Sequence, residues 1–149
     1  MGALLRHPDQ MERLWQDEAL LPTAVDEMLR WDSPVQLDTR SALEPAHVAG
    51  RDIEVKTRVV TLLGAANRDP AQFKDPDRFD VARDHGPPMS FASGIHYCLG
   101  ANLSRAEGQE VFGALRSRCA TIEPDGDLVR RNRITLRGYS SVPVVVSAR

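Results

Sequence analysis

The spacing of hydrophobic and polar residues predicts two helices near the start of the chain. Pro8 suits the first turn of a short helix that runs to about Gln16, because an amide hydrogen at that position would have no helical partner. Pro22 suits the start of a second helix, whose apolar residues recur at helical spacing. Those residues are Ala24, Val25, Met28 and Leu29. This helix is expected to end near Ser33, because the residue before a proline avoids the α region.

The middle of the chain predicts short strands followed by a long loop. Residues 35–42, 52–55 and 58–63 are predicted strands, and the last of them is expected to be buried because it is apolar and β-branched. Between residues 67 and 88, prolines, glycines and charged residues interrupt every periodicity. A loop of roughly twenty residues inside a compact domain is usually functional.

The last third predicts one long helix and two further strands. The helix covers residues 101–118, and its buried side is expected to consist of Leu103, Ala106, Val111, Ala114 and Leu115. Strands are expected at 134–137 and 142–146, joined by a turn at 138–141. The chain is therefore predicted to be α+β, with helices early and late and small sheets between them.

Composition narrows the class of protein. The chain has 149 residues, a formal net charge of −2 and 42% hydrophobic residues, which fits one domain with a packed core. This charge gives no reason to expect nucleic acid or a membrane surface as a partner, and no apolar run is long enough to cross a bilayer. The two cysteines, Cys98 and Cys119, fit neither a metal pair nor a disulfide framework, so we expect a reducing, cytoplasmic location.

The segment 91–101 is the strongest candidate for a functional site. Gly94 and Gly100 surround Cys98, and the predicted long helix follows directly. Glycines allow the backbone to approach a flat ligand closely. A helix N-terminus offers free amide donors and a partial positive charge, which stabilise a thiolate suited to metal ligation or nucleophilic chemistry. The alternative is an inert, buried cysteine in an ordinary turn.

This segment resembles the heme-ligand signature F-x-x-G-x-H-x-C-x-G of the cytochrome P-450 family, the heme-thiolate monooxygenases, in its soluble bacterial form. The matching residues are Phe91, Gly94, His96, Cys98 and Gly100. The resemblance implies that Cys98 is the axial ligand to the iron of heme b and that His96 donates to a heme propionate. It also implies the C-terminal part of a mainly helical fold, with small sheets and the cysteine loop before a long helix.

Two further motifs carry the same resemblance. Glu27 and Arg30 match the family's E-x-x-R and share one helix face, although such a pair is also common on protein surfaces. The resemblance implies that Arg78 completes a buried triad with them, as a structural clamp. Arg40 matches the family's propionate-binding arginine, the alternative being a surface charge.

The sequence departs from the family pattern at four positions near the signature. Ala92 and Ser93 stand where glycines are frequent, and Asn102 replaces a common proline. Gly108 lies inside the predicted long helix, where a glycine costs up to about 1 kcal/mol relative to alanine. None of these residues is an expected heme ligand.

The resemblance covers nearly the whole chain but only the C-terminal portion of a family member, so residues 1–149 are expected to be one incomplete domain. The family's longer N-terminal part carries an acid–alcohol pair on a distal helix, and no comparable segment is found here. Three functions follow. The chain belongs to a monooxygenase, it is a non-enzymatic truncated remnant that binds heme weakly or not at all, or it is an unrelated α+β binding module.

For the monooxygenase, the resemblance implies a small organic substrate and an electron-donor protein such as a ferredoxin. Residues 35–37 and 138–141 match segments that line the family's substrate pocket. Three arginines near the proximal face are expected to form a positive patch for the donor. They are Arg105, Arg116 and Arg118.

Overall fold

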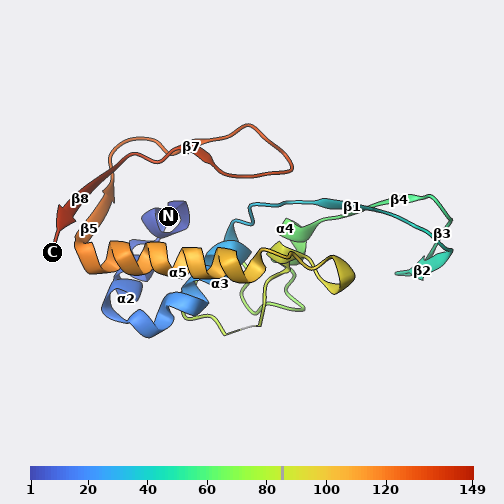
Figure 1. The fold of residues 1–149 in the computed structure, drawn as a ribbon, viewed down its shortest axis with the longest axis horizontal. Coiled ribbons are helices and arrows are strands. Elements are labelled where there is room, and N and C mark those ends of the chain that lie inside the picture. Colours follow the sequence, from blue (N-terminus) through green and yellow to red (C-terminus); the bar gives the residue numbers. More distant parts are fainter. Residues whose placement is uncertain (85) are drawn as a thin grey trace.

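The computed structural model describes residues 1–84 and 86–149, in an elongated arrangement of helices and two-stranded sheets (Figure 1). The α-helices are α1 (Gly2–Arg6), α2 (Pro8–Gln16), α3 (Leu21–Trp31), α4 (Leu63–Ala66) and α5 (Ala101–Arg118). Single 3-10 turns are η1 (Glu18–Leu20), η2 (Met89–Phe91) and η3 (Gly94–His96). The predicted helices at 8–16 and 101–118 are confirmed with these bounds.

Each sheet consists of two antiparallel strands. The first pairs β1 (Asp38–Ser41) with β4 (Arg58–Thr61), and the second pairs β2 (Ala46–Val48) with β3 (Arg51–Ile53). Together they form a long hairpin that extends away from the helices (Figure 1). The third pairs β5 (Cys119–Pro124) with β8 (Val144–Ala148), and the fourth pairs β6 (Val129–Arg130) with β7 (Tyr139–Ser141).

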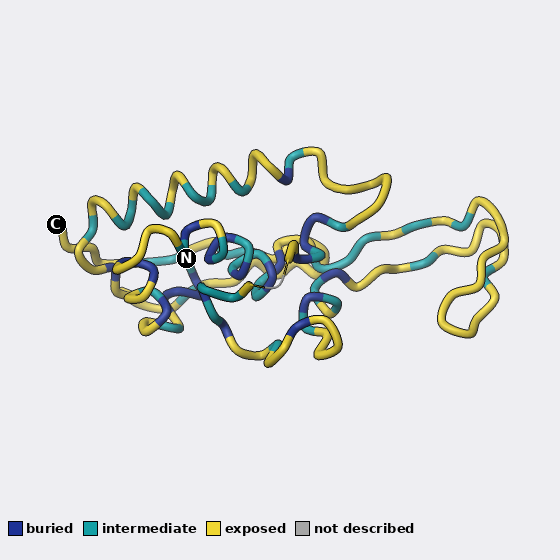
Figure 2. The backbone as a smooth tube through the Cα atoms, turned by 90° about the horizontal axis from the view of Figure 1, so that it is seen from below, coloured by how far each residue is buried: buried dark blue, intermediate teal, exposed yellow. Residues whose placement is uncertain are grey.

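Several strand predictions differ from the structure. The segment 134–137 contributes only a single bridge, between Leu136 and Val35, and β5 was not predicted at all. The prediction that 58–63 is a buried strand is wrong, because β4 ends at Thr61 and its residues are largely exposed. The β1–β4 hairpin has no layer packed over its apolar residues among the described elements (Figure 2).

The hydrophobic core lies between the N-terminal helices, the long loop and β5. Its buried residues are Ala3, Leu4, Leu5, Leu14, Trp15, Leu21, Ala24, Phe79, Val81 and Ile122. The indole nitrogen of Trp15 donates to the carbonyl of Cys119 at 3.0 Å, which joins α2 to the start of β5. Cys119 is thus a half-buried residue at the edge of this core.

Helix α5 packs on α3 through a face that agrees with the predicted one only at Leu115, which packs against the core together with Phe112. The other predicted residues, Leu103, Ala106, Val111 and Ala114, are exposed. The close contact is made by Gly108, where an added Cβ would meet a methyl group of the buried Val25 at 2.9 Å. A glycine that looks costly in the sequence therefore allows the two helices to approach each other.

None of the described helices is both long enough and apolar enough to span a membrane.

Gly108→Ala is expected to destabilise the chain by about 1–3 kcal/mol, because Val25 is branched and buried and has little room to move. Gly113→Ala on the same helix is the matched control, since its added Cβ would lie 3.6 Å from Leu21, an ordinary contact. The control is expected to gain up to about 1 kcal/mol from helix propensity. Urea unfolding monitored by circular dichroism measures both, and effects of the same sign would contradict this account of the contact.

Candidate functional site

The cysteine loop, residues 89–100, is closed by a backbone hydrogen bond. The amide of Cys98 donates to the carbonyl of Phe91 at 3.0 Å, so the two ends of the loop meet directly before α5. Gly100 is the residue that precedes the helix, and the amide of Ala101 donates to the carbonyl of Cys98 at 3.2 Å. The side chain of Cys98 is exposed. The sulfur is therefore delivered to the N-terminal end of an 18-residue helix and is not enclosed in the core.

Two residues of this loop have positive φ angles. Gly94 has φ +69°, which glycine adopts without cost. Ala92 has φ +58° and ψ −158°, close to a region that is almost restricted to glycine. The departure from the family pattern at Ala92 thus places a side chain where the backbone is strained. Ser93, at φ −154°, is extended and carries no such strain.

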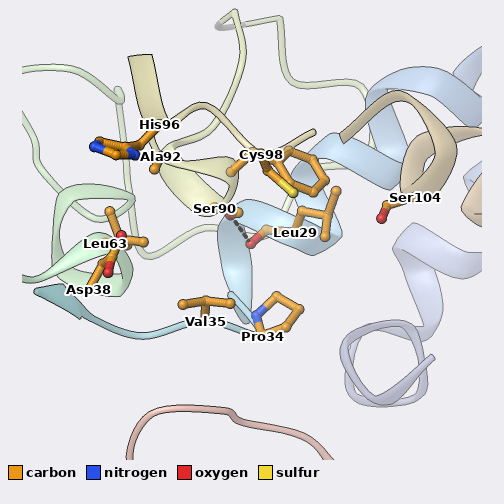
Figure 3. Close-up of a pocket in the computed structure, with 11 residues that line it drawn as sticks. Leu29, Pro34, Val35, Asp38, Leu63, Ser90, Ala92, His96, Cys98 and Ser104 are labelled. Carbon is orange, nitrogen blue, oxygen red and sulfur yellow. Dashed lines mark hydrogen bonds between the residues drawn. The ribbon is translucent and has the colours of Figure 1, made fainter. Parts of the chain in front are cut away.

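Beside the loop lies a cavity of about 470 Å³ (Figure 3). Its polar lining residues are Asp38, Ser90, His96, Cys98 and Ser104. Its apolar lining residues are Leu29, Pro34, Val35, Leu63, Phe91 and Ala92. The cavity thus gathers side chains from α3, the start of β1, α4, the cysteine loop and α5. Such a mostly apolar hollow with a few polar groups is typical of a small-molecule or cofactor site.

The structure brings several of the predicted site residues to this cavity. Phe91, His96 and Cys98 line it directly, and Gly94 and Gly100 shape the loop that carries them. Arg40 lies on β1 next to the cavity, paired with Asp38, and it also donates to the carbonyl of Thr39 at 3.0 Å. The Arg40 hydrogen bond and the Thr39 amide lower the pKa of Asp38, and the nearby His96 adds to the effect.

Of the two segments expected to line a substrate pocket, only the first reaches this cavity. Val35 lines its wall, and Asp38 follows a few residues later. Tyr139–Ser141 of the second segment form β7. Tyr139 lies against Gly2 and accepts a hydrogen bond from Arg6 at 2.6 Å. The second segment therefore lies outside this cavity, and its place at a substrate pocket stays a prediction.

A buried ion pair lies behind the cavity. The side chains of Glu27 and Arg30 are fully buried, and Arg30 donates to both carboxylate oxygens of Glu27 at 2.6 and 2.9 Å. Arg30 also donates to the backbone carbonyls of Asn67 at 2.7 Å and Pro76 at 2.9 Å. A bidentate pair of this kind fixes geometry as well as charge, and breaking it would leave a buried charge unpaired. The clamp therefore ties α3 to the long loop.

The prediction that Arg78 completes this clamp is wrong. The Arg78 side chain is 63% exposed and lies 4.0 Å from the carboxylate of Asp80. The third residue is Arg83, whose Nε donates to Glu27 at 3.2 Å from a side chain that is 10% exposed. Among the described residues, Arg78 contributes to the clamp through its backbone carbonyl, which accepts from Arg30 and Arg83.

The arginine that reaches Glu27 depends on a turn that the sequence analysis missed. The carboxylate of Asp80 accepts from the amide of Ala82 at 3.1 Å, and the amide of Arg83 donates to the Asp80 carbonyl at 3.0 Å. This turn brings Arg83 back toward α3. An aspartate whose side chain bonds to the amide two residues ahead is a common turn signal, and Asp80 could have been interpreted in that way.

A buried polar cluster joins the clamp to the cysteine loop. The side chain of Asn67 donates to the hydroxyls of Ser33 at 2.6 Å and Ser90 at 2.9 Å, and accepts from the amide of Met89 at 2.7 Å. Ser90 precedes Phe91 and also donates to the carbonyl of Leu29 at 2.6 Å. Nothing in the residues next to Asn67 in the sequence indicates these partners.

The three arginines expected to form a positive patch are mostly engaged within the chain. Arg105 pairs with Asp26 at 2.7 Å, and its side chain is 19% exposed. Arg116 pairs with Glu18 at 3.0 Å and is 18% exposed. Arg118, at the end of α5, is exposed. The patch as predicted therefore does not form, because two of the three charges are already balanced by carboxylates.

The described residues hold no cluster of three or more histidine, cysteine, aspartate or glutamate side chains that could bind a metal ion by themselves.

Comparisons with known proteins agree with this arrangement. Residues 4–131 match the family model described as Cytochrome P450. The chain is 41% identical over 141 residues to cytochrome P450 CYP199A2 of Rhodopseudomonas palustris, covering 95% of this chain and 34% of that protein. It is 42% identical over 145 residues to 6-deoxyerythronolide B hydroxylase of Saccharopolyspora erythraea, covering 95% of this chain and 36% of that protein.

The fold is also similar to solved structures. P450BioI, in complex with an acyl carrier protein ligated to hexadec-9Z-enoic acid, superposes with a TM-score of 0.93 at 38% identity, over 97% of this chain and 38% of that one. The chain belongs to the cytochrome P450 family, as the resemblance implied, and the alternative of an unrelated α+β binding module is excluded. It spans about a third of the length of the curated relatives that it matches.

Replacing Arg83 by methionine is expected to destabilise the chain by about 1–3 kcal/mol, because one hydrogen bond to the buried Glu27 carboxylate and three to backbone carbonyls are lost. Arg78→Met is the control, and its exposed side chain should make the cost no more than about 0.5 kcal/mol. Urea unfolding of both variants distinguishes the two arginines, and a larger loss for Arg78→Met would refute the assignment of Arg83.

Ala92→Gly is expected to stabilise the chain by about 1 kcal/mol. Relief of backbone strain, about 1–3 kcal/mol, outweighs the extra flexibility of glycine, about 0.5–1 kcal/mol. Ser93→Gly, at an extended position, should instead lose about 0.5–1 kcal/mol. Thermal unfolding compares them, and a loss of stability in Ala92→Gly would show that the alanine is not strained.

Proposed function

We propose that this chain is the heme-binding part of a cytochrome P450 monooxygenase, with Cys98 as the axial ligand of the heme iron. The observation that carries the proposal is the exposed Cys98 side chain, which lies beside a mostly apolar cavity and directly before the first turn of α5. Amide groups at a helix N-terminus stabilise a thiolate. A cysteine so exposed has no structural task in the core and is free to bind a ligand.

The residues around the cavity suit the two kinds of surface that heme b presents. Leu29, Val35 and Leu63 offer apolar contacts to a flat macrocycle. His96 and Arg40 are cationic or hydrogen-bonding groups on the side of Asp38, where propionates would be bound. A propionate at Arg40 would replace Asp38 as its partner, which is feasible because this ion pair is only partly buried.

When bound, heme supplies the oxygen-activating chemistry, and a cysteine ligand donates electron density that favours O–O bond cleavage. The chain contributes the position of the ligand. The Phe91–Cys98 backbone bond fixes the loop, and the clamp on Glu27 and Arg30 holds the helix behind it. The cavity wall near Val35 would meet a small organic substrate. Electrons would come from a donor protein such as a ferredoxin, and the working location would be the cytoplasm.

A second candidate function is a non-enzymatic remnant that binds heme weakly or not at all. It is favoured by exposed apolar side chains on the β4 strand, directly after it, and on α5. These side chains are Val60, Leu62, Leu103 and Val111. A surface of this kind normally requires a partner or leads to aggregation. In either case residues 1–149 would be one incomplete domain.

The decisive experiment is a difference spectrum of the reduced, carbon-monoxide-bound chain after incubation with heme. The Soret band of thiolate ligation is expected for the unmodified chain and for Cys119→Ser, and it should be lost in Cys98→Ser. Cys119→Ser is the natural control because the chain has two cysteines. A band that survives Cys98→Ser, or that disappears in Cys119→Ser alone, would overturn the assignment of the ligand.

The same preparations separate enzyme from remnant. Stoichiometric heme uptake with the thiolate band favours the monooxygenase, and no uptake by the folded chain favours the remnant. The reading frame upstream of Met1 is an independent check. An in-frame extension that encodes the missing part of the relatives supports an enzyme, and a stop codon supports a remnant.

A further inference from the structure

We propose that Arg105 is a positioning residue for Cys98, and that it anchors the cysteine loop to helix α3. Arg105 lies in the second turn of α5. Its Nε donates to the carboxylate of Asp26 at 2.7 Å, and its Nη1 donates to the hydroxyl of Tyr97 at 2.9 Å. Its guanidinium carbon also lies 4.8 Å from the centre of the Phe91 ring. One side chain therefore contacts both ends of the loop and the helix behind it.

These contacts add to the backbone closure of the loop. Phe91 and Cys98 are joined through their backbones at 3.0 Å, and the ring of Tyr97, the residue before the cysteine, lies edge-on to Phe91 with 6.4 Å between centres. Without Arg105, the Tyr97 side chain would keep only this ring contact. The peptide that leads into Cys98 would then be held by two backbone hydrogen bonds, from Cys98 to Phe91 and from Tyr97 to Gly94, both within the loop itself. Because no side chain would then tie the loop to α5 and α3 at this point, the sulfur would have a wider range of positions.

The side chain at this position must be arginine for these contacts to coexist. A guanidinium is planar, presents donors in diverging directions and stacks on an aromatic ring. A lysine ammonium has a single donor centre, which cannot reach the carboxylate and the phenol while it also covers the Phe91 ring. Lysine would keep the charge and lose the geometry, so it distinguishes electrostatic attraction from positioning.

Adjacent residues of α3 hold the cysteine loop and the long loop. Asp26 binds Arg105 and thereby the cysteine loop, while Glu27 binds Arg30 and Arg83 and thereby the long loop. A displacement of this part of α3 would thus move both loops together. Asp26 thus helps to fix the position of Cys98 relative to the rest of the cavity. Glu27 fixes the position of the long loop in the same way.

This inference rests on the proposed function only in naming Cys98 as the ligand, and its geometry is testable without heme. The measurement is hydrogen exchange of the Cys98 amide in the full chain, resolved by NMR. Arg105→Met is expected to raise that exchange rate by at least about tenfold. The loss of one charge-assisted hydrogen bond increases the population of the locally open state by about this factor. Tyr97→Phe, which removes only the phenol, should give part of the same increase.

Arg116→Met is the matched control, because Arg116 lies on the same helix, is equally buried and pairs with a carboxylate at a similar distance. It should leave the Cys98 amide unchanged while it lowers overall stability to a similar degree. Arg105→Lys should resemble Arg105→Met. An unchanged Cys98 amide in Arg105→Met, an equal increase in Arg116→Met, or full rescue by lysine would each overturn the proposal.

Heme-loaded samples provide a spectroscopic readout that a loss of stability alone would not change. In Arg105→Met the thiolate Soret band is expected to broaden or shift, with Arg116→Met unchanged. If the unmodified chain takes up no heme, the proposed function fails and the exchange experiment still decides the role of Arg105. If heme binds and the exchange rates do not respond, the proposed function stands and this inference fails.

Discussion

The structure depends on the ion pair between Glu27 and Arg30, which is removed from water in the middle of the chain. Burying two charges is costly, and the cost is met only when every remaining donor and acceptor finds a partner. Here the remaining arginine donors go to backbone carbonyls of residues 67, 76 and 78, and the carboxylate also receives Arg83 and the amide of Asp80. A loop with little regular structure is thereby held in one conformation, and the floor of the cavity is held with it.

How much of the fold and of the site the sequence predicts depends on how far apart in the chain the interacting residues lie. The helix at 101–118 and the cysteine loop before it follow from local rules on turns, prolines and periodicity, and the helix has the predicted bounds. The choice between Arg78 and Arg83 depends on a turn at Asp80 whose two ends meet a helix more than fifty residues earlier. The packing face of α5 depends on Gly108, because a missing side chain permits a contact that hydrophobic spacing cannot indicate.

Residues that connect parts of the site were the hardest to predict. Asn67, Ser33 and Ser90 form a buried polar cluster whose members lie far apart in the chain, and each residue alone is typical of an exposed turn. Arg105 was interpreted as a free surface charge, because its partners Asp26 and Tyr97 come from different elements. Buried polar side chains must provide one another with hydrogen-bond partners. Whether they do so depends on the whole group of residues and cannot be inferred from any one of them.

The two tryptophans of the chain give these regions built-in optical reporters. The Trp15 indole is bonded to the carbonyl of Cys119 at the junction of α2 and β5, whereas Trp31 lies beneath the guanidinium of Arg68 with 3.8 Å to the ring centre. Arg68 also bonds to the carbonyl of Trp31 and the carboxylate of Asp77 in the long loop. The emission of Trp31 therefore senses whether the long loop is docked, and that of Trp15 senses the junction of α2 and β5. Variants that each keep one tryptophan would follow the two regions separately by intrinsic fluorescence.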